Sequence, residues 1–392
     1  MKITIQQLDA FYSYSPETNQ SQVIYEIDLG DKKYEIFIRS NILPKQFGLE
    51  AIVPLALLAA MRLKRPIHVK GALSRSFLDG VKKVMFIYES SFDCFSSVEI
   101  TADHIYEANA ESGQRKASFF SGGVDSFFTL LKSPEKLTDL VVIHGFDIDL
   151  RDADRREKVH KMTSEVAAQM GMRLIEIESN FSKIIKDYGL WVEHGHGLAL
   201  VSVARALAGE ISQIKIPGSF TINEQKPWGS SLEVDPKFSD ERLQIIHDAS
   251  DVERIGKIES IIKYPITLKY LRVCGDIKYD GMYNCCRCEK CIRTMCSLYA
   301  LNVLDKSEAF VKPLTPDVIV NTMLRNPTAK KFALENLSLL KRYRPGDTDF
   351  IDAIQRQINR PIWMANFQFR IRKKVRHVKE KLQRLRKLLQ LS

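Results

Sequence analysis

Residues 117–220 alternate between short apolar stretches typical of strands and longer amphipathic stretches typical of helices. The strand-like stretches are ASFF (117–120), LVVIHGF (140–146), RLIEIES (173–179) and QIKIPGSF (213–220). Strands separated by helices tend to pair in parallel, because a parallel connection has to cross back over the sheet. The alternation therefore predicts an α/β fold with a parallel sheet and helices on both of its faces.

The rest of the 392-residue chain predicts further domains on either side of this region. Residues 1–112 hold two strand-like stretches around a GDK turn and a buried helix, which indicates a small α+β domain of unknown role. The α/β domain is expected over 113–300 and a helical C-terminal region over 301–360. A basic amphipathic helix is expected over 361–392.

Neither a membrane span nor a secretory signal is expected, so we predict a cytoplasmic protein. The longest strongly apolar run, residues 51–61, is too short to cross a bilayer, and no basic-then-apolar signal pattern opens the chain. The net charge is +10, and ten Lys/Arg against one Glu between Arg370 and Lys387 supply nine of these units. The body of the chain is thus nearly neutral, which argues against a fold built for nucleic acid.

The junction between the first strand and the first helix of the α/β region reads SGGVDS, residues 121–126. Glycines let backbone N–H groups close around phosphate oxygens, and the positive end of the following helix points at the same place. The expected phosphate-binding residues are Ser121, Gly122, Gly123, Val124, Asp125 and Ser126. A carboxylate beside a polyphosphate needs a cation between them, so Asp125 predicts Mg²⁺; the alternative is that Asp125 only caps the helix.

SGGVDS resembles the PP-loop signature SGGxDS of the ATP pyrophosphatases, and it lies at the strand-to-helix junction that this signature requires. No Walker-type GxxxxGK[ST] sequence occurs in the chain. The resemblance implies a PP-loop domain of the HUP-like class that binds ATP and Mg²⁺ and cleaves ATP between its α and β phosphates. It also implies that the second strand ends against adenine, which makes His144, Gly145 and Phe146 candidates for that contact. For His144, a histidine that merely satisfies the strand end is the alternative.

Six of the seven cysteines lie between Cys274 and Cys296. Cys274, Cys285, Cys288 and Cys291 follow the spacing C-x10-C-x2-C-x2-C, which is typical of four thiolates around one tetrahedral Zn²⁺. A zinc ion with four sulfur ligands has no open position for water, so the predicted site is structural. An iron–sulfur cluster and unliganded core cysteines are the alternatives.

A PP-loop domain followed by a four-cysteine loop of nearly this spacing resembles the 7-cyano-7-deazaguanine synthases over residues 117–300. In that family ATP activates a carboxylate, and ammonia converts the acid to an amide and then to a nitrile. The chain departs from the family at HGFDID after the second strand, in residues 217–236, in residues 1–112 and in its basic tail. The resemblance therefore implies the activation chemistry better than it implies the substrate.

Two further segments offer candidate contacts. Residues 250–261 resemble a helix-opening segment of these synthases, which implies that Lys257 and Arg254 hold the leaving pyrophosphate; a solvated helix face is the alternative. Trp228 is expected either to stack on a planar substrate or to pin its loop. For His194 and His196, contact with substrate or phosphate is favoured over a second metal site.

Together these features predict an ATP-dependent ligase that adenylates a carboxylate or an amide, releases pyrophosphate and forms an amide or a nitrile. Asp125 and Lys257 are the expected catalytic residues. The expected partners are a small-molecule or peptide carboxylate and an amine or ammonia donor, and a homodimer is compatible with the sequence. The alternatives are a tRNA-modifying thiolase with a PP-loop and a non-catalytic nucleotide-binding module. The basic tail is expected to contact RNA, an anionic membrane or a partner protein, or to be a solvated helix.

Overall fold

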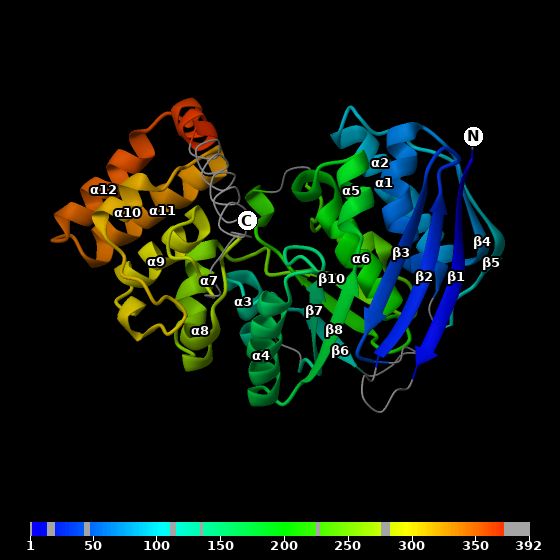
Figure 1. The fold of residues 1–392 in the computed structure, drawn as a ribbon, viewed down its shortest axis with the longest axis horizontal. Coiled ribbons are helices and arrows are strands. Elements are labelled where there is room, and N and C mark those ends of the chain that lie inside the picture. The colour runs from blue at the N-terminus through cyan, green and yellow to red at the C-terminus, as the bar shows by residue number, and fades with distance from the viewer. Residues whose placement is uncertain are drawn as a thin grey trace, which may run out of the picture. The chain divides into compact units, whose positions relative to one another are not determined.

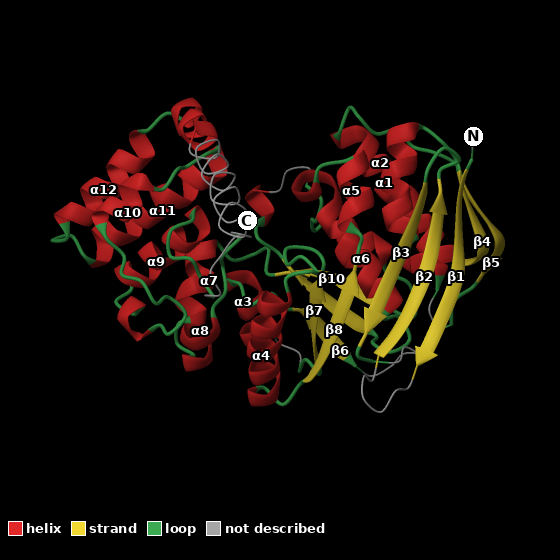
Figure 2. Cartoon of the chain, viewed as in Figure 1, coloured by secondary structure: helices red, strands yellow, loops and turns green. Residues whose placement is uncertain are grey.

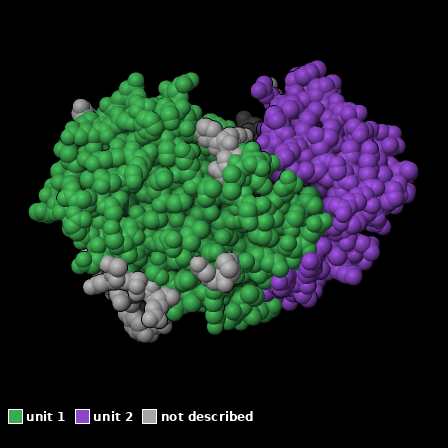
Figure 3. Space-filling model, turned by 180° about the vertical axis from the view of Figure 1, so that it is seen from behind, with its two compact units in different colours: residues 1–261 green, residues 262–392 purple. Residues whose placement is uncertain are grey.

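The computed structural model describes residues 2–13, 20–42, 48–109, 115–133, 136–224, 228–275 and 283–371. The chain divides into two compact units, residues 1–261 (unit 1) and residues 262–392 (unit 2), which Figure 3 colours green and purple. Unit 1 holds the β-sheet, and the described secondary structure of unit 2 is helical (Figure 2). The part of the expected basic helix beyond Ile371 lies outside the described residues.

Ten strands of the described chain form one sheet in the order β10-β9-β6-β7-β8-β3-β2-β1-β4-β5. They are β1 (Ile3–Ser13), β2 (Gln20–Asp28), β3 (Lys33–Ser40), β4 (Ile67–Ser74), β5 (Ile100–Tyr106), β6 (Lys116–Phe119), β7 (Asp139–His144), β8 (Arg173–Ser179), β9 (Gln213–Pro217) and β10 (Gln244–Asp248). Six neighbouring pairs run parallel, and three pairs (β1 with β2, β2 with β3, β3 with β8) run antiparallel. The predicted α/β class is thus confirmed, with a mostly parallel sheet.

The parallel strands β6 to β10 are compatible with a Rossmann-like domain (Figure 1). Along the chain, β7 and β8 are added on one side of β6, and β9 and β10 are then added on its other side. The strand order therefore reverses between β6 and β9. In open α/β sheets, ligands bind outside the carboxyl ends of the strands at such a reversal.

Helices connect and cover these strands. The helices of unit 1 are α1 (Val53–Leu63), α2 (Arg75–Ser91), α3 (Val124–Lys132), α4 (Ala153–Gln169), α5 (Ser182–Tyr188), α6 (His196–Ala206) and α7 (Arg254–Ile261). α3 packs on β6 and β9, and α4 packs on β7 and β8. α1, whose sequence VPLALLAAMRL is apolar on all sides, is almost entirely buried and contacts α2, α5 and α6.

Residues 1–109 do not fold into a compact unit of their own. β2 and β3 form the hairpin predicted around the GDK turn, but β3 also pairs with β8 of the expected α/β domain. The register joins Ile38 with Ser179 and Ser40 with Ile177, so the sheet continues from one expected domain into the other. The observed boundary, after residue 261, therefore differs from the boundary expected near residue 112. Pairing between strands that lie far apart in the chain leaves no local signal in the sequence.

The described part of unit 2 is a group of packed helices, as the sequence predicts for residues after 300. They are α8 (Pro265–Tyr270), α9 (Glu289–Ala300), α10 (Pro316–Asn321), α11 (Pro327–Tyr343), α12 (Thr348–Asn359) and the terminal helix, residues 362–371. α11 packs on α9 and α12, and α10 packs on α12. A bilayer-crossing helix would need a length and an apolar character that none of the described helices combines.

Candidate functional site

The SGGVDS segment turns the chain from β6 into α3. Gly122 has a φ of 75°, a left-handed conformation that favours glycine, and Gly123 is the N-cap of α3. Two serines hold the loop: Ser126 Oγ donates to the Gly123 carbonyl oxygen at 3.1 Å, and the Gly123 N–H donates to Ser121 Oγ at 3.3 Å. The positive end of α3 thus opens at the carboxyl end of the central strand, where an anion would be stabilised.

Asp125 lies in the first turn of α3, and groups from two other segments of unit 1 surround it. Its carboxylate accepts a hydrogen bond from Ser219 Oγ at 3.1 Å. Lys257 Nζ lies 3.5 Å and Arg254 Nη1 lies 3.8 Å from the carboxylate oxygens. These contacts join the loop after β6 to the segment after β9 and to α7, and they favour a role for Asp125 beyond helix capping.

Lys257 is completely buried on α7, which packs against α3. Its Nζ donates to the Gly218 carbonyl oxygen at 2.6 Å and faces Asp125. Burial lowers the pKa of Lys257 below its ordinary value, although the Asp125 carboxylate acts in the opposite direction. The alternative of a solvated helix face is wrong for Lys257, and the side chain of Arg254 is only 11% exposed.

Gly218 and Ser219 follow β9 and form the other side of the strand-order reversal. A side chain at Gly218 would put its Cβ 2.7 Å from His247 Nε2 and 2.8 Å from the Asp248 carbonyl oxygen, so only glycine fits between the ends of β9 and β10. Through Ser219 and the Gly218 carbonyl oxygen, this turn contacts both Asp125 and Lys257. Sequence analysis missed both residues of the turn, because PGSF carries no recognisable motif.

His144, Gly145 and Phe146 lie at the carboxyl end of β7, the strand that pairs with β6. Gly145 has a φ of 97°, and a Cβ there would lie 1.9 Å from the Ser179 carbonyl oxygen, so glycine is required. The Phe146 ring packs on Trp191 at 5.1 Å, and the buried His144 ring has its Nε2 3.3 Å from a Glu176 oxygen. Both side chains thus have partners within unit 1.

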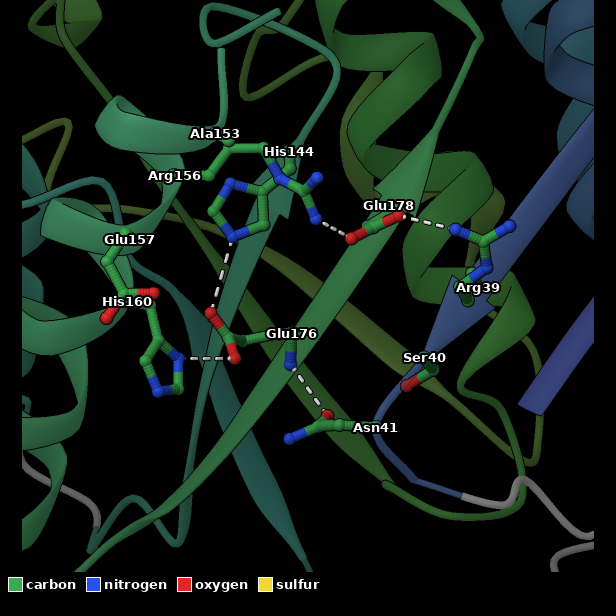
Figure 4. A pocket seen from close by; sticks show the side chains of 10 residues that line it. All are labelled: Arg39, Ser40, Asn41, His144, Ala153, Arg156, Glu157, His160, Glu176 and Glu178. Atoms are coloured by element: carbon green, nitrogen blue, oxygen red, sulfur yellow. Dashed lines mark hydrogen bonds and ion pairs between the residues drawn. The ribbon is translucent and has the colours of Figure 1, made fainter. Parts of the chain in front are cut away.

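A polar cavity of about 310 Å³ lies beside His144 (Figure 4). The charged side chains and histidines that line it are Arg39, His144, Arg156, Glu157, His160, Glu176 and Glu178. Glu176 faces His144 on one side and His160 Nδ1 at 2.8 Å on the other, while Glu178 pairs with Arg39 at 2.8 Å and with Arg156. Burial raises the pKa of Glu176, but the two histidines outweigh burial and lower it. These two carboxylates tie β3, β7 and α4 to β8.

A second cavity, of about 40 Å³, adjoins Ser219. Its lining combines aromatic rings with uncharged polar groups: His196, Pro217, Ser219, Phe220, Trp228, Ser230, Ser231 and His247. The Trp228 ring lies 5.7 Å from that of Phe220 and 6.4 Å from that of His196. Trp228 therefore borders a cavity next to the hydrogen-bond partner of Asp125, a position that suits contact with a substrate.

A buried carboxylate orients His247 in the wall of this second cavity. Asp235, which is fully buried, accepts hydrogen bonds from His247 Nδ1 at 2.8 Å and from Ser230 Oγ at 2.6 Å. A carboxylate that holds the proton on Nδ1 leaves Nε2 as a proton acceptor, and Nε2 faces Gly218. Sequence analysis missed both Asp235 and His247, because they come from separate elements and form no motif.

His194, in contrast, is only partly buried and packs against aromatic side chains. Its Nδ1 accepts a hydrogen bond from the Leu190 N–H at 3.0 Å, and its ring packs edge-on against Phe92 and Phe95. Burial lowers the pKa of His194 and so favours the neutral ring. His194 lines neither of the two cavities described above, whereas His196 lines the second.

Cys274, Cys285, Cys288 and Cys291 form a cluster in unit 2 in which all four sulfur atoms lie within 4.8 Å of one another. The sulfurs of Cys285 and Cys291 are 3.8 Å apart, and those of Cys274 and Cys288 are 4.0 Å apart. Four Zn–S bonds of ~2.3 Å in a tetrahedron would separate the sulfurs by about 3.8 Å. The cluster can therefore bind a metal such as zinc.

Local structure brings these four residues together. Cys288 is the N-cap of α9 and Cys291 lies in its first turn, while the Cys288 N–H donates to Cys285 Sγ at 3.2 Å. The buried Asn284 side chain accepts a hydrogen bond from the Cys274 N–H at 3.2 Å, which fixes the fourth residue; sequence analysis missed Asn284. The hydrogen bond with Cys274 raises the pKa of Cys285, but those with Cys288 and Cys291 outweigh it and lower the pKa to about 7.

The structure brings one group of expected residues together in unit 1 and another in unit 2. In unit 1, the SGGVDS loop, Arg254 and Lys257 converge on Asp125, and His144 to Phe146 lie at the next strand end. In unit 2, the four expected cysteines form the candidate metal centre. Comparison of the chain with models of protein families, with curated proteins and with solved structures found no match.

Proposed function

We propose that the chain is an ATP-dependent ligase that cleaves ATP between its α and β phosphates and transfers AMP to a carboxylate, as the PP-loop synthases it resembles do. The observation that carries the proposal is the convergence of the SGGVDS loop, Lys257 and Arg254 on Asp125, where the strand order reverses. The N-terminus of α3 and the side chains of Lys257 and Arg254 are positively charged groups of the kind that bind a polyphosphate. The position is also the usual ligand site of an open α/β sheet.

The residues of the site act by position and charge. The loop amides and the N-terminal end of α3 bind phosphate oxygens. Lys257 and Arg254 stabilise the negative charge that develops on pyrophosphate as the bond between the α-phosphorus and the bridging oxygen breaks. The new bond joins the α-phosphorus to a carboxylate oxygen of the acceptor. Mg²⁺, when bound, neutralises phosphate charge beside Asp125, whose carboxylate oxygens are ligands of the kind that this ion prefers.

His247 provides a group that accepts a proton in the second half of the reaction. An amine attacks the acyl carbon of the adenylate, the C–N bond forms, and AMP leaves with the electron pair of the C–O bond. The amine has to lose a proton, and His247 Nε2, with Nδ1 held by Asp235, is oriented to accept it. We expect the carboxyl end of the acceptor to approach beside the small cavity bordered by Trp228, because Ser219 belongs both to the wall of that cavity and to the contacts of Asp125.

In unit 2 we propose one structural Zn²⁺ on the four-cysteine cluster. Sulfur separations of 3.8 and 4.0 Å suit one ion surrounded by all four thiolates. A [4Fe–4S] cluster instead binds each thiolate to a different iron, which requires wider spacing. This observation favours a zinc-containing ligase over a thiolase that depends on an iron–sulfur cluster.

The proposal is tested in two steps that do not require the acceptor to be known in advance. Binding of α,β-methylene-ATP, which cannot be cleaved between the α and β phosphates, is measured by calorimetry with and without Mg²⁺. The full-length protein is then incubated with ATP, Mg²⁺, ammonia and a pool of carboxylic acids and peptides, and mass spectrometry identifies the products. We expect AMP, pyrophosphate and an amide or a nitrile. Release of ADP and phosphate instead would refute the assignment.

Asp125→Asn should abolish AMP formation while leaving the circular dichroism spectrum and the zinc content unchanged. The matched control is Asp79→Asn, which alters an exposed carboxylate on α2 whose partner is Lys82. This control should keep full activity, because Asp79 forms only a surface ion pair. Equal activity of the two variants would contradict the role of Asp125.

A further inference from the structure

The terminal helix, residues 362–371, carries an exposed apolar stripe. Trp363, Phe367 and Ile371 are 69%, 59% and 45% exposed. Because residues four apart lie on the same face of an α-helix, the three side chains form one continuous strip. Scattered single apolar residues are normal on a protein surface, but a contiguous strip with two aromatic rings marks an interaction site.

The opposite face of this helix is fixed to unit 2. Ala365 is buried, and the Asn366 side chain exchanges hydrogen bonds with Arg325: it accepts from Nε at 3.3 Å and donates to the carbonyl oxygen at 3.1 Å. The Arg325 guanidinium also lies 3.6 Å from the centre of the Phe369 ring. These contacts set the rotation of the helix, so its packing within unit 2 holds the stripe outward.

A strongly basic sequence begins where the stripe ends. Arg370 is exposed at the end of the terminal helix, and the segment from Arg370 to Lys387 contains ten Lys/Arg and one Glu. An apolar aromatic strip beside a concentrated positive charge is the composition of interfacial membrane anchors. Each Lys or Arg near an anionic membrane surface adds about 1 kcal/mol of attraction.

We propose that the terminal helix docks the protein on an anionic lipid surface. Trp363, Phe367 and Ile371 enter the boundary between headgroups and acyl chains, and the positive charge that the sequence carries from Arg370 onward attracts the protein to anionic headgroups. A second copy of the chain fits less well, because dimerisation through this face would bring two strongly positive segments together. RNA would match the charge but would leave the aliphatic part of the strip unburied. The proposal does not depend on the ATP chemistry.

The test is flotation of the full-length protein with vesicles of phosphatidylcholine containing about one-third phosphatidylserine, and with vesicles of phosphatidylcholine alone. We expect binding only to the anionic vesicles, and we expect it to fall steeply as salt rises. The double variant Trp363→Ala/Phe367→Ala should reduce partitioning by at least about tenfold, because it removes most of the buried apolar area. Trp363→Phe should keep most of the binding and lose the blue shift of tryptophan fluorescence that vesicles cause.

Phe86→Ala is the matched control, because Phe86 is 70% exposed but lies on α2 in unit 1, outside the stripe. It should bind vesicles as the wild type does. Equal binding to both kinds of vesicle, or unchanged binding of the double variant, would overturn the proposal. Two other results would also overturn it: salt-sensitive binding to single-stranded RNA without vesicle binding, and a dimer in solution that the double variant dissociates.

Discussion

Lys257 is a buried cation whose Nζ contacts two oxygen atoms, one on the Asp125 carboxylate and one on the Gly218 backbone. Burial lowers its pKa below 10.5. Between that lowered value and 10.5, the unfolded chain binds a proton that the folded chain has released. Stability rises with pH wherever the unfolded state binds more protons, so the penalty of burying this ammonium should be relieved as pH rises through that window.

Lys257→Met should therefore change both stability and catalysis. At neutral pH the variant should be less stable than the wild type, because the Asp125 carboxylate and the Gly218 carbonyl oxygen lose the group that donates to them. The wild type should gain stability relative to the variant as pH approaches 10.5, the ordinary value for lysine. ATP cleavage should fall by about a hundredfold or more, because the leaving pyrophosphate loses a cation. Thermal unfolding across this pH range measures the first effect, and a pH-independent difference would contradict it.

Cys288→Ser should remove the bound metal and destabilise unit 2, because the folding energy that the metal contributes is lost with its ligand. Cys296→Ser is the control: Cys296 is buried, its pKa is raised by burial to about 12, and it lies outside the four-cysteine cluster. Both variants are analysed for zinc by elemental mass spectrometry and for thermal stability. A Cys288→Ser protein that keeps one zinc per chain would contradict the assignment.

The residues that sequence analysis found are those that belong to short motifs. SGGVDS and the cysteine spacing are local, so Asp125 and the four cysteines could be predicted from the sequence alone. Asp235 and His247 share a hydrogen bond from two separate elements, and nothing in their immediate sequence marks the pair. His194 was expected to contact substrate or phosphate, and its ring packs against Phe92 and Phe95 outside both cavities.

At the scale of elements, the ends of β9 and β10 approach each other so closely that they depend on Gly218. Gly218→Ala would force its Cβ against His247 Nε2 and the Asp248 carbonyl oxygen. The loop has to shift, which displaces Ser219 and the acceptor of the Lys257 hydrogen bond. We expect a loss of about 1–3 kcal/mol in stability, as for other overpacked sites. Affinity for α,β-methylene-ATP should fall by about tenfold, as measured by calorimetry.

Gly346→Ala is the matched control for Gly218→Ala, because a Cβ at residue 346 meets no atom within 4 Å. It should leave both stability and nucleotide affinity within about 0.5 kcal/mol of the wild type. Unchanged nucleotide binding in Gly218→Ala would show that the turn after β9 does not line the ATP site.

Strand pairing was predictable from the sequence where two strands that follow each other along the chain also pair in the sheet. β6 and β7 follow each other along the chain and pair, and so do β7 and β8. The pairing of β3 with β8 was not predictable, because strand alternation gives the face that a strand buries but not its partner. Together with the packing of α1 on α5 and α6, this pairing joins residues before 112 to the rest of unit 1.

At the scale of the whole molecule, the candidate metal centre and the proposed ATP site lie in different compact units. Removal of zinc by a chelator should therefore loosen unit 2 first. We expect hydrogen–deuterium exchange to rise in α9 and α11, which pack on each other beside Cys288 and Cys291, while strands β6 to β9 keep their protection. Equal loss of protection in both units would show that the whole chain unfolds as one cooperative body.

Strand β3 covers one side of β8 that would otherwise be an edge of the sheet. β8 pairs with β7 on one side and with β3 on the other, so the residues that pair with β3 expose no unpaired backbone groups along that side. A fragment that begins at residue 113 would lack β3. Strand β8, with the sequence RLIEIES, would then be an exposed edge strand. Such edges recruit other strands and seed aggregates. β3 thus covers this end of β8, and a fragment that begins at residue 113 is expected to aggregate more readily than the full chain.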